Sequence, residues 1–132
     1  DDELSFYYLQ HDHQPDTFIR RGVLRIDGFR SLHGSGFPGG VAITKPLLFK
    51  GNQLEINAAT GAGGGIQIGF LDAETQQPIP GFETSQEFYG DRIQHFVYFA
   101  EKQDLSSLAE TPVRLKLVLY EADLFSFKFS DP

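Results

Sequence analysis

The sequence contains no Cys, no Met and no Trp. Without Cys it can form no disulfide framework, no thiolate zinc site and no thiol nucleophile. The absence of Met, in a chain that begins Asp1-Asp2-Glu3, indicates a piece processed or excised from a longer protein. No apolar run approaches the roughly 18 residues of a membrane-spanning segment, so no membrane partner is expected.

The chain is short of positive charge, with 11 Lys and Arg against 18 Asp and Glu. Residues 1–66 hold seven acids and six bases (net −1), and residues 67–132 hold eleven acids and five bases (net −6). A chain with this balance repels a phosphate backbone, which excludes nucleic acid as the expected partner. An acidic surface is suited to neutral ligands and to divalent cations.

Aromatic residues are abundant, and apolar residues alternate with other residues along much of the chain. The 132 residues include 13 Phe and five Tyr, which favour the pleated surface of a strand. Apolar residues recur with a period of two, which predicts about nine short strands, over residues 4–9, 22–29, 41–44, 46–49, 54–57, 66–70, 93–99, 113–119 and 124–129. Between them lie glycine loops at 34–40 and 61–65, and one helical turn is expected at 104–109, capped by Asp104. We therefore expect residues 1–132 to form a single all-β domain, a two-sheet antiparallel β-sandwich of jelly-roll-like type.

Three groups of segments carry a resemblance to a known family. They are Leu-Arg-Ile-Asp-Gly-Phe-Arg-Ser-Leu at 24–32, Thr-Lys-Pro-Leu-Leu-Phe-Lys-Gly at 44–51 with 54–57, and 112–117 with 122–127. Together they resemble the C-terminal β-sandwich of uncharacterised bacterial proteins whose N-terminal part is similar to the five-bladed propeller of the glycoside hydrolase family 32 and 43 clan. The resemblance implies an accessory domain of a carbohydrate-active enzyme. In that clan the catalytic carboxylates lie in the propeller, so no catalytic residues are expected in this chain.

Two groups of residues are candidates for carbohydrate binding, since sugars are recognised by aromatic faces and by planar polar side chains. The first is a sheet face made by outward-facing residues, if their strands are neighbours: Glu55, Asn57, Gln67, Arg114 and Lys116. The second is a set of loop aromatics: Phe37, Phe88 and Tyr89. The alternatives are an ordinary solvated sheet face and, for Phe37, a ring folded back over one end of the sandwich.

Metal binding has weaker support. Asp27 and Asp123 lie at the ends of expected strands, where a carboxylate either ligates calcium or caps a turn. No other cofactor is expected, and the pair of imidazoles in His11-Asp12-His13 is not a complete site.

We expect a non-catalytic carbohydrate-binding or accessory module, with a polysaccharide or oligosaccharide and the catalytic domain of a parent enzyme as partners, in a secreted or periplasmic protein. The alternatives are a structural or interaction domain that packs against its parent enzyme or mediates oligomerisation, and a self-sufficient enzyme. The last would need two carboxylates about 5 to 10 Å apart in a cleft.

Overall fold

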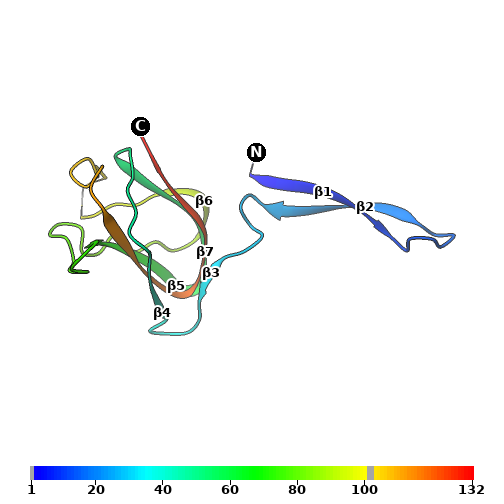
Figure 1. Ribbon diagram of the computed structural model, residues 1–132. Coiled ribbons are helices and arrows are strands. Elements are labelled where there is room, and N and C mark those ends of the chain that lie inside the picture. The colour runs from blue at the N-terminus through cyan, green and yellow to red at the C-terminus, as the bar shows by residue number, and fades with distance from the viewer. Residues whose placement is uncertain (1, 101–102) are drawn as a thin grey trace. The chain divides into compact units, whose positions relative to one another are not determined.

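A computed structural model describes residues 2–100 and 103–132 of the chain. In these residues all the regular structure is β-strand and no helix is present, so the predicted all-β class is confirmed. The strands form two antiparallel sheets, one of two strands and one of five. The chain divides into a first unit that ends at Arg30 and a second that begins at Ser31 (Figure 1).

The first unit is a β-hairpin. Strand β1 (Glu3–Gln10) pairs with β2 (Phe18–Arg25) from Glu3 opposite Arg25 to Gln10 opposite Phe18. The second strand therefore begins and ends four residues before the predicted 22–29. Residues 26–29 form a turn instead, in which the Gly28 N–H donates to the Arg25 carbonyl at 2.9 Å.

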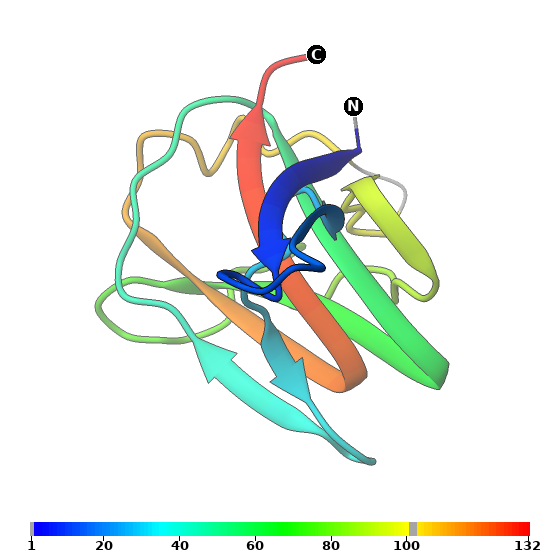
Figure 2. The same ribbon diagram turned by 90° about the vertical axis from the view of Figure 1, so that its right-hand side faces the viewer.

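The second unit is organised by two strands of unusual length, β5 (Gln53–Asp72) and β7 (Val113–Ser130). They pair antiparallel along almost their whole length and make a two-stranded ribbon. The prediction had divided each of them into two separate strands. In Figure 2 both strands bend sharply near the middle and run on in a new direction. This bend curls the larger sheet so that its two halves face one another, which gives the sandwich-like fold that was predicted.

The bend is produced by unequal lengths of chain. Thr60 pairs with Ala122 and Gly65 with Tyr120, so residues 61–64 lie opposite the single residue Glu121. Such a bulge bends a strand and lets it change direction without ending. The predicted glycine loop at 61–65 is thus the bulge of one continuous strand.

The remaining strands lie along the edges of the ribbon. Both β3 (Leu32–Gly34) and β4 (Gly40–Ile43) pair with β7, and β6 (Asp91–Phe96) pairs with β5. The segment 78–88 runs beside the second half of β5 through isolated bridges. No helix forms at 104–109, where one helical turn was expected. Residues 106–110 form hydrogen-bonded turns instead, and Asp104 accepts the Ser106 N–H at 2.8 Å, the capping role expected of it.

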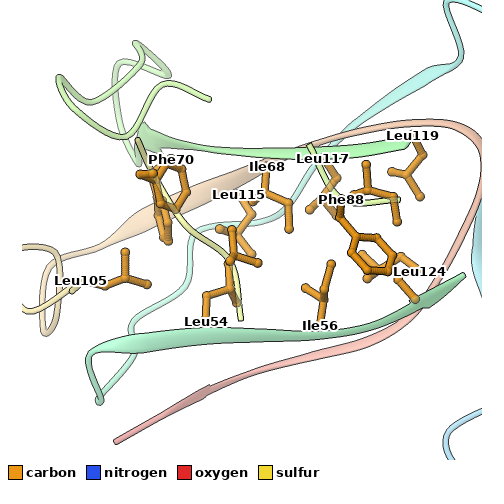
Figure 3. Close-up of a cluster of buried hydrophobic side chains, with 14 of the residues drawn as sticks. Leu54, Ile56, Ile68, Phe70, Phe88, Leu105, Leu115, Leu117, Leu119 and Leu124 are labelled. Carbon is orange, nitrogen blue, oxygen red and sulfur yellow. The ribbon is translucent and has the colours of Figure 1, made fainter. Parts of the chain in front are cut away.

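The core lies between the two halves of the ribbon. Alternate residues point into it from both strands, and the change of direction at Glu121 lets β7 keep apolar side chains inside on both sides of the bend (Figure 3). The core residues on these two strands are Leu54, Ile56, Ala58, Ile66, Ile68, Phe70, Val113, Leu115, Leu117, Leu119, Ala122 and Leu124. Because the core uses one side of each strand, the side chains between these positions point away from it.

Candidate binding site at the bend of the ribbon

The structure does not bring the five predicted sheet-face residues onto one face. Glu55 and Asn57 lie on the first half of β5, whereas Gln67 lies on its second half, paired with the part of β7 that carries Arg114 and Lys116. The two halves face each other across the core, so their outward sides point in opposite directions. Gln67 and Lys116 therefore share one outer side, and Glu55 and Asn57 share the other.

Glu55 is enclosed by polar partners and is only 5% exposed. Its carboxylate accepts hydrogen bonds from the Ser130 hydroxyl at 2.5 Å and the Gln94 amide at 2.6 Å, and Nζ of Lys128 lies 3.2 Å away. Burial acts to raise the pKa of Glu55, but the bonds from Ser130, Gln94 and Lys128 together hold this pKa below its ordinary value. These contacts give Glu55 a structural role.

Two other residues of the predicted sheet face also have their side chains buried or hydrogen-bonded within the fold. Asn57 is buried, and it pairs with Ser126 in the ladder. The guanidinium of Arg114 donates to the carbonyls of Ala73 at 3.0 Å and Thr44 at 3.1 Å, which ties together two loops beside the sheet.

The three predicted loop aromatics differ in how far they are exposed to solvent. The prediction of an exposed Phe88 is wrong: its side chain is 4% exposed and belongs to the core. Phe88 exchanges two backbone hydrogen bonds of 2.9 Å with Ile66. Its ring packs against the ring of His95, with the two centroids 4.6 Å apart. Since neighbouring residues of an extended segment point to opposite sides, Tyr89 is turned outward and is 77% exposed. Phe37 is 86% exposed.

Beside Tyr89 the surface is hollowed. The hollow has a volume of about 440 Å³ and is lined by Thr60, Gly61, Ala62, Gly63, Gly64, Glu87, Tyr89 and Gly90. The bulge supplies one wall, where small residues leave backbone open to the hollow. Two hydrogen bonds fasten the other wall to it, from the Thr60 N–H to the Gly90 carbonyl at 2.8 Å and from the Gly90 N–H to Oγ1 of Thr60 at 2.9 Å.

A chain of contacts links Phe37 to this hollow. The ring of Phe37 stands edge-on to the ring of Tyr120, with centroids 5.8 Å apart and planes at 86°. The Tyr120 hydroxyl donates to Oε2 of Glu87, which lines the hollow. This hydrogen bond raises the pKa of the Tyr120 phenol, because it stabilises the protonated form beside a carboxylate.

The local charge is negative. Glu87 lines the hollow, and Glu121 at the bend accepts the Gly36 N–H through Oε1 at 2.5 Å. No Lys or Arg is among the described residues that line the hollow. The hollow thus offers an aromatic face, a hydroxyl, carboxylate oxygens and backbone groups to a ligand that carries no negative charge.

The residues predicted for calcium lie in different units. Asp27 has a φ of 57° in the turn that follows β2, and Asp123 lies on β7. Oδ1 of Asp123 accepts the Ser31 hydroxyl at 2.7 Å and lies 3.0 Å from Nδ1 of His33. Within residues 2–100 and 103–132, no three His, Asp or Glu side chains form a group that could hold a metal ion. The Ser31 hydroxyl bonds to the carboxylate and not to the imidazole, so these three residues do not form the relay of a serine hydrolase.

Comparison of the chain with protein-family models, curated proteins and solved structures gives no match. Among the described residues, no helix has the length and apolar character required to span a bilayer.

The sequence indicated Phe37 and Tyr89 but missed Glu87, Tyr120 and Thr60. One signal was available for the wall of the hollow, because five small residues from Gly61 to Gly65 stand between two clear strand patterns. That run was assigned to a loop, and the pairing across it could not be seen in the sequence.

Proposed function

We propose that the chain is a non-catalytic carbohydrate-binding module, an accessory domain of a secreted or periplasmic carbohydrate-active enzyme, and that the hollow at the bend holds the sugar. The observation that carries the proposal is the exposed ring of Tyr89 on the wall of the hollow. A sugar ring packs its C–H face on an aromatic face, and its hydroxyls need hydrogen-bonding groups around the rim. Thr60, Glu87 and the backbone of the bulge supply those groups.

The size and charge of the hollow narrow the ligand class. A volume of about 440 Å³ lies within the range usual for small-molecule sites. The carboxylate of Glu87, which lines the hollow, repels uronic acids and sulfated sugars, so the proposed ligand is a neutral polysaccharide or oligosaccharide. The resemblance to the accessory sandwich of the family 32 and 43 clan supports the same assignment.

The test is affinity electrophoresis of the chain through gels that contain neutral polysaccharides, followed by calorimetry with oligosaccharides of any polysaccharide that retards it. Tyr89→Ala is expected to weaken binding about tenfold or more, equivalent to about 1.4 kcal/mol. Leu48→Ala is the matched control, because Leu48 is also exposed but lies beside the bridge from Leu47 to Val113, at the start of β7 and far from the bend. No retardation by any neutral polysaccharide would sink the proposal.

The absence of catalysis is tested on the same ligands. We expect no release of reducing ends when the chain is incubated with a polysaccharide that it binds. Hydrolysis that is lost in Glu87→Gln would establish an enzyme instead, since Glu87 is the carboxylate that lines the hollow.

The alternative, an interaction domain, is favoured by a different observation. The hairpin of the first unit exposes large apolar side chains, among them Tyr7 at 71% and Ile19 at 69%. Such surfaces mark contacts with other protein. Under this alternative, charged substitutions in the hairpin abolish an assembly, and Tyr89→Ala changes nothing that can be measured.

A further inference from the structure

The hairpin of β1 and β2 carries apolar side chains on both of its faces. Directly opposite residues share a face, so the register divides the side chains into two sets. One face holds Leu4, Phe6, Tyr8, Phe18 and Leu24, and the other holds Tyr7, Leu9, Ile19 and Val23. A two-stranded hairpin is marginally stable in water by itself, so a ribbon with this composition is expected to gain stability from a further strand.

The outer edge of β1 is open to such a strand. In the described residues β1 pairs only with β2, and its other edge presents backbone N–H and C=O groups. Natural edge strands are usually protected by Lys, Pro, bulges or inward-pointing charge. The six residues 4–9, Leu-Ser-Phe-Tyr-Tyr-Leu, contain no charge, no Pro and no Gly.

The other edge of the hairpin is protected. Strand β2 carries Arg20, Arg21 and Arg25, and it contains Gly22, over which the Phe6 ring lies. A glycine weakens the addition of a strand, and so does the like charge that Arg20 places on one face and Arg21 and Arg25 place on the other. The two edges therefore differ, and the edge of β1 is the one without these protective features.

We propose that β1 pairs antiparallel with β1 of a second copy of this chain, so that two hairpins form one four-stranded sheet. The two-fold axis is perpendicular to that sheet and keeps each apolar face continuous across the two copies. With the axis at Phe6 or Tyr7, uncharged residues lie opposite each other along the centre of the strand. Glu3 is the one charged residue of β1, and it lies at the end, opposite Leu9 or His11 of the other copy.

The first test is the oligomeric state of the 132-residue chain, measured by sedimentation velocity over a range of concentrations. The wild type is expected to form dimers, and Tyr7→Glu is expected to raise the dissociation constant about tenfold or more. This variant should keep the hairpin, because position 7 is paired with Arg21 on the same face. Ile19→Glu is the matched control, with the same charge, the same face and nearly the same exposure, but on β2.

The second test uses the absence of Cys. Phe6→Cys and Tyr7→Cys place single thiols at the proposed axis, where paired Cα atoms lie about 4.5 to 5.5 Å apart, within the range of a disulfide. One of them should form a disulfide dimer much faster than Ile19→Cys under mild oxidation, and which one does so gives the register.

Three results would overturn the proposal. The first is a monomer at every concentration up to the millimolar range. The second is a dimer that Ile19→Glu dissociates and Tyr7→Glu does not, which would indicate packing of faces in place of edges. The third is equally slow oxidation of all three Cys variants.

Discussion

The hydroxyl of Tyr120 donates a hydrogen bond to Oε2 of Glu87, which lies 33 positions earlier in the sequence. Tyr120 lies on β7 where the ribbon bends, and Glu87 lies on the segment that borders β5. The bond thereby joins the bend to the outer wall of the hollow. The ring of Phe37 rests edge-on against the same Tyr120, so one phenol contacts groups from two other parts of the chain.

The bond predicts a late titration of one tyrosine. Because the folded pKa of Tyr120 is raised above its ordinary value of 10.0, the stabilisation is present below that pH and is lost as the pH rises through the folded pKa. Absorbance of phenolate should therefore contain a late step, above the ordinary tyrosine pKa of 10.0, that belongs to Tyr120. Tyr120→Phe should remove that late step, and Glu87→Gln should move it to lower pH. A titration curve unchanged in both variants would contradict the bond.

The geometry of the bulge predicts that Ala substitution at two glycines changes the free energy of unfolding by very different amounts. A Cβ on Gly64 would lie 2.3 Å from the carbonyl oxygen of Glu121 and 2.8 Å from that of Tyr120, and backbone cannot move aside cheaply. A Cβ on Gly40 would meet nothing within 4 Å. We therefore expect Gly64→Ala to lower the free energy of unfolding by about 2 kcal/mol or more, and Gly40→Ala to change it by less than about 0.5 kcal/mol. Urea denaturation measures both, and equal effects would argue against the bulge as described.

The strands and the bend were not equally accessible to prediction from the sequence. The alternation of Leu54 and Ile56, and of Leu115 and Leu117, reports which side of a strand is buried, and both segments are strands. Glycines at 61–65 signal that a strand cannot continue regularly, but a bulge and a loop satisfy that signal equally. Pairing across the chain decides between them.

The candidate site shows the same limit. Phe88 and Tyr89 are adjacent, so one ring had to turn inward and the other outward, and the fully apolar ring is the buried one. The sequence could have predicted which ring is exposed, because Tyr89 carries a phenol hydroxyl and Phe88 carries no polar group. The enclosure of Glu55 could not have been predicted from the sequence, because its partners come from the two strands on either side of it. Gln94 lies on β6, and Lys128 and Ser130 lie at the end of β7.

The core predicts contrasting effects for two phenylalanines. Phe70 is completely buried, and its ring lies within 6.4 Å, centroid to centroid, of the rings of Phe49, Phe82, Phe99 and Phe129. Phe70→Ala removes these contacts and leaves a cavity, at an expected cost of about 3 to 5 kcal/mol. The same substitution at the exposed Phe37 should cost less than about 0.5 kcal/mol. Thermal or urea unfolding compares the two, and similar values would show that the ring cluster is not the core.

The lowered pKa of Glu55 predicts how the free energy of unfolding changes at acidic pH. Its folded pKa lies below the ordinary value of 4.5, so its stabilisation is present above that pH and is lost as the pH falls through the folded pKa. Glu55→Gln should cost about 1 to 3 kcal/mol at pH 7, because the buried group loses its charge-assisted bonds with Ser130 and Lys128.

The Glu55→Gln variant should also lose less stability than the wild type as the pH is lowered below about 4.5. Urea midpoints measured from pH 7 to pH 3 test this, with Lys128→Ala as the control. Lys128 is mostly exposed, so its removal should cost about 1 kcal/mol or less and should leave most of the acid dependence in place. If Lys128→Ala flattened the profile as fully as Glu55→Gln, the ion pair would be the source of the depressed pKa, and the bonds from Ser130 and Gln94 would contribute little.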